Sequence, residues 1–223
     1  MAKSEYEAYI RTDELLALQK PESELNNPDE ILFQVTHQAM ELWLKALAHD
    51  IRRIPTLVEE GKLHRAAHLL RRGAEMIGIC NAQLHVLENM DPADYHPIRL
   101  GLGRGSGQDS PGFNWILDHA REILWPAFEG ARKARGVEVL DLMRTPDRHY
   151  DLYQLMQGLL ELDTTFQKFR YLHYSLVRRI IGSEVRSLKG IPASQLIHGA
   201  TECLFPELWE AVNALTREFK PEY

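Results

Sequence analysis

The chain carries three long stretches in which apolar residues recur at alternating spacings of four and three, and this periodicity constrains the fold most strongly. The first stretch begins near residue 28 and runs to about Pro55. An imidazole, that of His37, takes one place in its apolar row. The other members of the row are Phe33, Met40, Leu44, Leu47, Ile51 and Ile54. Such a row is typical of an amphipathic helix that packs its apolar face in the core, so we expect His37 inside the protein.

Two further stretches follow the same spacing. The second spans about residues 58–90, and its apolar row runs from Leu63 to Leu84. The third spans 148–181, and His173 takes the one place in its row that is not apolar. No window alternates with a period of two among β-branched residues, as a strand would. The pattern therefore predicts an all-α fold, a bundle of long antiparallel helices, in a single domain over residues 1–223.

Helix-starting and turn-forming residues set the expected limits of the other elements. Residues 1–27 predict a short amphipathic helix with Thr12 or Asp13 as its cap, and Pro28 starts the first long helix. The stretch 95–112 is so rich in glycine and proline that it predicts an irregular, functional loop instead of a regular helix. Further helices are expected at about 113–136, 193–203 and 206–218.

Composition and charge narrow the classes of function. The net charge of −6 leaves no basic surface for nucleic acid. No apolar run approaches the roughly 18 residues of a membrane-spanning helix, and the start of the chain lacks a signal pattern. Cys80 and Cys203 are too few for a disulfide framework or a structural zinc site. We therefore expect a cytoplasmic protein in a reducing setting, with neither nucleic acid nor membrane as a partner.

The two histidines in the apolar rows carry the most functional information. Either one taken alone is more often a core histidine that a hydrogen bond satisfies. Two together, on the main helices of an all-α chain without cysteine ligands, favour a haem pocket. In such a pocket one imidazole binds the iron and the opposite face stays open to oxygen and substrate. The spacing does not decide which of His37 and His173 is the iron ligand.

Two other groupings have simpler explanations. His64 and His68 stand four residues apart, a spacing that can bind a metal, but they lie among arginines with no carboxylate at matching spacing, which favours a solvated basic face. The stretch 101–107 is rich in glycine, yet it follows no strand and lacks the Lys-Ser/Thr ending of a phosphate loop. Its backbone amides, with Arg99 nearby, suit an anionic group such as a haem propionate.

Motifs along the whole chain resemble one family. They are Tyr6-x-x-Tyr9-Ile10, Leu32-Phe33-x-x-x-His37-Gln38-x-x-Glu41-Leu42-Trp43-Leu44-Lys45, Arg99-x-x-Leu102-Gly103-x-x-Ser106-Gly107, Phe169-Arg170-x-x-His173 and Leu204-Phe205-Pro206-Glu207-Leu208. In this order they resemble tryptophan 2,3-dioxygenase, and the His-Gln-x-x-Glu-Leu-Trp-x-Lys core is highly specific. The chain is thus identified as a short, divergent member of this haem-dependent oxygenase superfamily.

The resemblance implies a bundle that encloses haem b, with His173 as the proximal ligand of the iron. It places Ser106 and Gly107 over the haem edge. It places His37 on the distal side, where its imidazole meets the indole N–H of the substrate.

For the substrate, the resemblance implies that Phe33 and Leu102 line the indole pocket and that Tyr95 and Arg99 hold the carboxylate. A guanidinium suits this role because it binds a carboxylate through two charge-assisted hydrogen bonds. Ser187 stands where the family has a threonine that touches the substrate ammonium and carboxylate. The expected catalytic residues are His37, Tyr95, Arg99 and Ser187.

The N-terminal arm, residues 1–27, is apolar for a chain end. Tyr6, Tyr9 and Ile10 match residues that in this family pack on a neighbouring subunit and complete its substrate pocket. The resemblance therefore implies a homotetramer or another homo-oligomer.

The chain departs from the family pattern in three places. The stretch 115–150 lacks room for a helical insertion of the family. Residues 108–114 replace a Phe-Gln-Ser-x-Gln-Tyr-Arg run, and residues 185–190 replace a glycine-rich lid. A changed lid bears on substrate identity and reaction outcome more than on haem binding.

The implied reaction inserts dioxygen across the indole 2,3-bond of L-tryptophan or a substituted tryptophan and gives N-formylkynurenine. One alternative stops after a single oxygen transfer, giving a 2-oxindole or hydroxylated product with the help of a reductant. A haem sensor or carrier is another alternative, but a gas sensor would not need Arg99. A non-haem metal hydrolase would need a carboxylate–histidine cluster that the sequence does not show.

Overall fold

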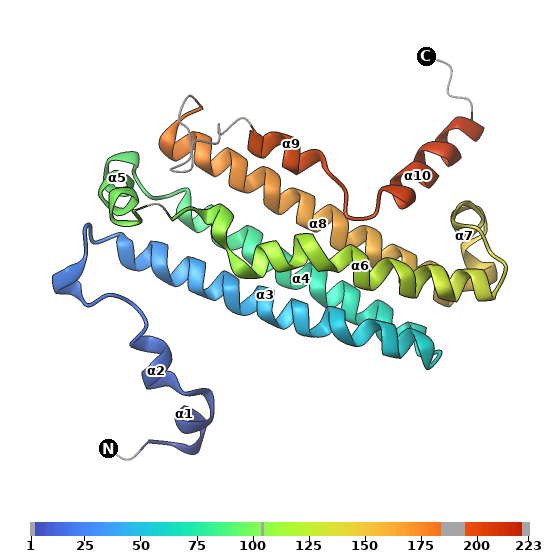
Figure 1. Cartoon of the computed structure of the whole chain (residues 1–223), viewed down its shortest axis with the longest axis horizontal. Helices are drawn as coiled ribbons and strands as arrows, with labels where there is room; N and C mark the ends of the chain where they lie inside the picture. Colours follow the sequence, from blue (N-terminus) through green and yellow to red (C-terminus); the bar gives the residue numbers. More distant parts are fainter. Residues whose placement is uncertain (1–2, 104, 184–194, 220–223) are drawn as a thin grey trace.

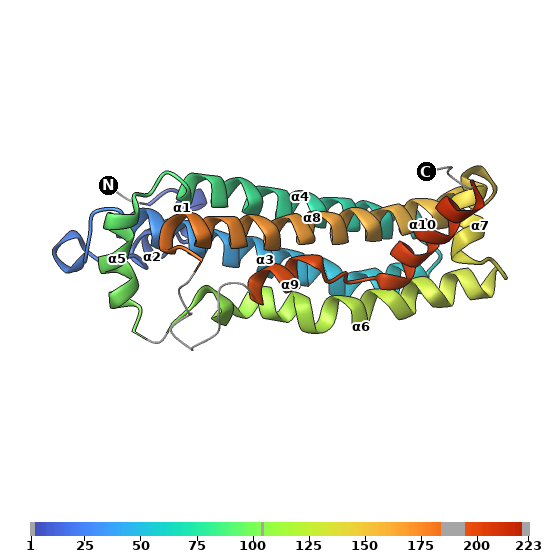
Figure 2. The same cartoon turned by 90° about the horizontal axis from the view of Figure 1, so that it is seen from above.

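Four long helices form the body of the molecule in the computed structural model, which describes residues 3–103, 105–183 and 195–219. They are α3 (Glu30–Glu59), α4 (Leu63–Leu87), α6 (Pro111–Ala134) and α8 (Tyr150–Ile181). All four lie side by side along the long axis of the molecule (Figures 1 and 2). No strand occurs in the described ranges. The prediction of an all-α bundle is therefore confirmed.

The direction of the helices follows from the connections between them. A short turn joins α3 to α4, so these two helices are antiparallel, whereas α3 and α6 run the same way (Figure 1). Among the described helices, α4 and α8 share the most extensive contact, and they also run the same way. Gly158 makes this approach possible, because a Cβ there would lie 2.9 Å from the Cβ of Leu70. The bundle thus combines antiparallel and parallel neighbours.

The predicted apolar rows are buried. Along α3, Leu47 and Ile51 are 1% exposed, and along α8, Leu152 and Phe166 are 0% and 1% exposed. His37 and His173 are only half-buried, because their rings border a cavity instead of packed side chains.

The first long helix was expected to end near Pro55, and here the structure differs. α3 continues through Pro55 to Glu59, with Ile54 and Val58 buried on either side of the proline. A proline inside a helix costs about 3 kcal/mol, and burial of these neighbouring side chains offsets that cost. Likewise α6 continues through Pro126.

The expectation of an irregular loop over 95–112 is wrong for its first part. Helix α5 spans Pro92–Gly101 and includes Pro97. Pro92 lies at the start of this helix, where no N–H bond is lost, and Ile98 is fully buried. Beyond the helix the chain turns at Gly103, whose φ of 60° favours glycine. The remainder holds one short 3-10 turn, η2 (Gly107–Asp109).

The N-terminal arm forms two short helices, α1 (Glu5–Ile10) and α2 (Thr12–Leu16), which lead away from the bundle (Figure 1). Ser4 caps α1 through the N–H of Glu7, so the expected caps Thr12 and Asp13 are wrong. The arm attaches to the bundle just after α2. There the buried Glu30 accepts hydrogen bonds from the Lys20 ammonium and the Asn26 backbone, both at 2.7 Å.

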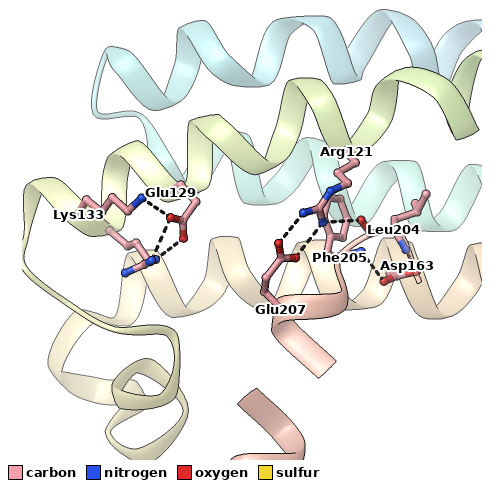
Figure 3. A network of polar contacts seen from close by, with 8 residues as sticks. Arg121, Glu129, Lys133, Asp163, Leu204, Phe205 and Glu207 are labelled. Atoms are coloured by element: carbon pink, nitrogen blue, oxygen red, sulfur yellow. Dashed lines mark hydrogen bonds and ion pairs between the residues drawn. The ribbon is translucent and has the colours of Figure 1, made fainter. Parts of the chain in front are cut away.

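The C-terminal part folds back along α8 as α9 (Gln195–Thr201) and α10 (Pro206–Glu218), the latter beside the short helix α7 (Val139–Arg144) (Figure 2). The fully buried Asp163 of α8 anchors this return. It accepts hydrogen bonds from the N–H groups of Leu204 and Phe205 at 3.0 and 3.1 Å, shown in Figure 3. The sequence pattern did not predict α7.

Candidate active site

A cavity of about 830 Å³ opens at the end of the bundle where α3 begins and α8 ends. Its walls come from α3, α4, α5, α6, α8 and α9 and from the stretch between α5 and α6. Eight of the predicted site residues line it: Phe33, His37, Tyr95, Leu102, Arg99, Ser106, Gly107 and His173. The fold therefore brings together residues from four parts of the sequence, and most of the remaining wall is apolar.

His37 projects from the first third of α3. Its Nδ1 lies 2.7 Å from the carbonyl oxygen of Phe33. Because a carbonyl only accepts, Nδ1 must carry the proton, and in the neutral ring Nε2 is then an acceptor. Burial lowers the pKa of His37, although the Phe33 carbonyl and the carboxylate of Glu41 oppose this shift. The site thus presents a neutral imidazole with a lone pair on Nε2.

His173 lies in the last third of α8. Its ring is parallel to that of Phe169, with centroids 6.5 Å apart and planes at 5°. Burial, with a smaller contribution from His37, lowers the pKa of His173 to about 4. Its imidazole makes no hydrogen bond to any residue in the described part of the chain. A neutral imidazole without a hydrogen-bond partner is available as a metal ligand.

Tyr95 and Arg99 stand four residues apart on α5, so both side chains lie on one face of that helix. Their shared position depends on α5 being helical, which the sequence did not predict. The ring of Tyr95 lies 5.9 Å from that of Phe33, which in turn lies 4.1 Å from the imidazole of His37. Burial raises the pKa of the Tyr95 phenol, against the effect of Arg99. A protonated phenol and a guanidinium thus border one end of the cavity.

Two cavity residues have contacts that the sequence did not predict. The carboxylate of Glu41, on α3, accepts hydrogen bonds from the start of α6. Arg170, on α8, donates to the carbonyl and the carboxylate of Glu202 and packs so closely on α9 that a Cβ at Gly199 would lie 2.6 Å from its guanidinium. Both residues fall inside motifs quoted above, but a motif does not say which distant partner a side chain binds.

Three of the predicted site residues do not border this cavity, and a fourth, Ser187, lies outside the described residues. Tyr6, Tyr9 and Ile10 are exposed on the arm, Tyr9 to 88%, and do not border the cavity of their own chain. Their predicted role concerns a neighbouring subunit and stays a prediction.

The residues present fit a haem group. A neutral imidazole faces an apolar cavity, and a second imidazole lies near enough to influence its protonation. Gly107 lies beside His173, and even a methyl group there would approach within 3.4 Å of Nε2. A side chain at position 107 would therefore be in direct contact with this nitrogen.

The described ranges give no support for another kind of metal site or for a membrane-spanning helix. They contain no cluster of three or more histidine, cysteine, aspartate or glutamate side chains that could hold a metal ion. His64 and His68 are exposed, and Cys80 and Cys203 are free. None of the helices within these ranges has the length and apolar character to cross a membrane.

Comparison with known proteins gives one consistent result. The family model described as tryptophan 2,3-dioxygenase matches residues 1–119. The chain is 25% identical to a tryptophan 2,3-dioxygenase of Xanthomonas campestris pv. campestris over 97% of its length and 89% of that protein. It is 29% identical to that of Erythrobacter litoralis, covering 94% of the chain and 98% of that protein.

The relatives also carry segments that this chain lacks, because the two alignments span 265 and 261 positions against 223 residues. The matches nevertheless cover nearly the whole chain. The match to the family model alone extends over more than half of the chain. The chain therefore belongs to the tryptophan 2,3-dioxygenase family and is a haem-dependent oxygenase.

Proposed function

We propose that the chain binds haem b and inserts both atoms of dioxygen across the indole 2,3-bond of L-tryptophan or a substituted tryptophan, giving N-formylkynurenine. The proposal rests on one observation: two neutral imidazoles and a Tyr–Arg pair border the same apolar cavity. The imidazoles suit a haem and an indole, and the Tyr–Arg pair suits an amino-acid carboxylate.

His173 is the iron ligand in this proposal, with Ser106 and Gly107 beside the haem. Its imidazole is neutral, lacks a hydrogen-bond partner among the described residues and borders the open cavity. Haem b, when bound, supplies the iron that activates dioxygen. Oxygen chemistry of this kind belongs to the cofactor, and the chain's own residues bind and orient the reactants.

Arg99 and Tyr95 hold the substrate carboxylate. The guanidinium donates two parallel hydrogen bonds to a carboxylate, and the Tyr95 phenol keeps its proton to donate a third. Ser187 is proposed to reach the ammonium or carboxylate from the segment between α8 and α9. These contacts fix the amino-acid end of the substrate.

His37 accepts the indole N–H at Nε2, because Nδ1 already donates to the Phe33 carbonyl. The ring of Phe33 forms an aromatic wall beside this imidazole, and Leu102 adds an apolar contact. Orientation in a cavity with mostly apolar walls accounts for much of the advantage that the protein supplies.

The arm is proposed to complete the pocket of a neighbouring subunit in a homotetramer. Tyr6, Tyr9 and Ile10 are 71%, 88% and 38% exposed in the single chain. Apolar side chains gathered on a projecting segment favour contact with another protein surface. Support for the tetramer comes from this exposure and from family membership.

Monooxygenation is the second candidate, favoured by the altered stretch 108–114. Gln108 and Asn114 border the cavity, where the family pattern has phenylalanine and arginine, whereas Ser110 matches the serine of that pattern. A single oxygen transfer in the same cavity would give a 2-oxindole or a hydroxylated product and would consume a reductant.

Mass analysis of the product decides between these candidates. The haem-loaded protein is reduced without oxygen, mixed with L-tryptophan and then given dioxygen. A gain of two oxygen atoms is the expected result, and a gain of one would establish the monooxygenase. Absence of turnover with L-tryptophan and with substituted tryptophans would overturn both.

A further inference from the structure

We propose that Glu41 is a positioning residue for the reaction. Its carboxylate holds the stretch Ser106–Ser110 in the place where Gly107 lies beside the imidazole of His173. The inference rests on the proposed function, since it concerns the same cavity. It assigns Glu41 a task that neither the sequence pattern nor the roles derived above contain.

Both oxygens of the Glu41 carboxylate bind the start of α6. The Ser110 hydroxyl donates to one oxygen, and the Gly112 N–H donates to the other at 3.0 Å. Ser110 also accepts the N–H of Phe113 at 3.1 Å and so caps the helix. Charge-assisted hydrogen bonds are about twice as strong as neutral ones, so this carboxylate fixes α6 on α3.

The contact between Glu41 on α3 and the first turn of α6 is tightly packed. A Cβ at Gly112 would lie 2.7 Å from the Glu41 carboxylate and 2.8 Å from the Cβ of Leu44. The first turn of α6 is therefore in direct contact with α3, and only glycine fits there. Loss of the carboxylate would release the strongest bonds across this contact.

A chain of hydrogen bonds extends from this junction to Gly107. The side chain of Asn114 donates to the Gln108 carbonyl at 3.0 Å. The Gln108 N–H donates to the Ser106 hydroxyl at 3.0 Å, and the Ser106 N–H donates to the Asp109 carboxylate at 3.1 Å. Gly107 lies inside this network, so the position of the network sets the distance between Gly107 and His173.

Glu41 also follows His37 by one turn on α3. One helix therefore positions the imidazole that faces the substrate and, through Glu41, the stretch that borders His173. Tyr95 and Arg99 lie on α5, whereas the two hydrogen bonds of the Glu41 carboxylate go to Ser110 and Gly112 at the start of α6. Loss of Glu41 should thus disturb the reacting groups and spare the carboxylate contacts.

The test compares Glu41→Gln and Ser110→Ala with the wild type, each as the haem-loaded enzyme. Glu59→Gln is the matched control, because it is the same substitution on an exposed part of α3. Four quantities are measured: kcat for the accepted tryptophan, its KM, the cyanide affinity of the ferric haem, and hydrogen exchange of the backbone amides within 106–113.

We expect Glu41→Gln to speed exchange in 106–113, to change the cyanide affinity and to lower kcat about tenfold, with KM changed less than about twofold. Ser110→Ala should act in the same direction, and the double variant should be no worse than the more severe single one, since the two residues act through one contact. Glu59→Gln should match the wild type in all four quantities.

Wild-type kcat in Glu41→Gln would overturn the inference, whether or not exchange increases, as would unchanged exchange in 106–113. A rise in KM alone would also overturn it, because Glu41 would then serve substrate binding. A wild-type protein without haem or turnover would instead overturn the proposed function, and the inference with it.

Discussion

At the scale of single residues, the two histidines of the cavity differ in what fixes them. His37 is held by the Phe33 carbonyl, which sets its tautomer and leaves Nε2 as an acceptor. His173 is fixed only by packing within the described chain, beside Phe169 and Gly107. This difference supports the assignment of His37 to the substrate and of His173 to the iron, which the resemblance implied and the helical spacing left open.

His173 should make the stability of the haem-free protein depend on pH. Its pKa is lowered from 6.5 to about 4 by burial, so the unfolded chain binds more protons than the folded one between these values. Neutral His173 therefore makes its full contribution to the free energy of unfolding above about pH 6.5. This contribution, on the order of 3 kcal/mol, is lost as the pH falls toward 4. Urea unfolding from pH 7 to pH 4 should show a steeper loss in the wild type than in His173→Gln. Equal slopes in the two proteins would contradict the assignment of the lowered pKa.

Arg99 should contribute mainly to substrate binding. Arg99→Lys keeps the positive charge but loses the paired donors of the guanidinium. We expect KM for L-tryptophan to rise about tenfold or more while kcat changes little. Steady-state kinetics of this variant, with 3-methylindole as a substrate that lacks the carboxylate, test the role. If Arg99→Lys had the same KM for L-tryptophan as the wild type, the proposed role of Arg99 in substrate binding would be wrong.

At the scale of elements, the return of the chain along α8 depends on one buried carboxylate. Asp163 is 0% exposed and accepts four hydrogen bonds. Besides the two backbone N–H groups, the donors are the Trp209 indole at 2.8 Å and the Gln167 amide at 3.1 Å. Arg121 of α6 closes the same junction through the Leu204 carbonyl and Glu207 (Figure 3). α9, which carries the cavity residue Gly199, is thereby held on α8.

Asp163→Asn should destabilise the fold by about 2–4 kcal/mol, because the amide group of asparagine would direct its own N–H at N–H donors. The free energy of unfolding in urea measures this loss. Asp118→Asn, an exposed aspartate of α6, is the control and should stay within about 0.5 kcal/mol of the wild type. Equal stability of the two variants would show that the buried carboxylate does not hold the junction.

At the scale of the whole molecule, the N-terminal arm projects from the bundle (Figure 1). Its attachment through Glu30, Lys20 and Asn26 is firm, but α1 and α2 contain no buried residue. Helices as short as these are not stable alone in water. The exposure of Tyr6, Tyr9 and the leucines of α2 fits the proposal that the arm packs on another subunit.

Removal of residues 1–17 should lower the mass of the assembly and raise KM for L-tryptophan, since each arm would complete a neighbour's pocket. Light scattering after size-exclusion chromatography gives the mass, and steady-state kinetics give KM. The anchor of Glu30 remains in the shortened chain, so the bundle should keep its helical circular dichroism. An unchanged mass with unchanged KM would contradict the proposed role of the arm.

The sequence determined what depends on local periodicity. Spacings of four and three fixed the long helices and their buried faces, including Leu47 and Ile51, and placed one histidine on each of α3 and α8. The same local rules failed at Pro55 and Pro97, where proline and glycine predicted an end or a loop. There the burial of Ile54, Val58 and Ile98 outweighed the backbone preference.

Only the tertiary structure decided which residues meet across the cavity. The turn after α5 places Gly107 beside His173, the helical form of α5 aligns Tyr95 with Arg99, and Glu41 binds α6 some seventy residues away in sequence. A residue type and its spacing specify which face of a helix it occupies. They carry no information on the partner, because that depends on how closely two distant backbones approach, and at Gly112 and Gly158 a single missing side chain sets that distance.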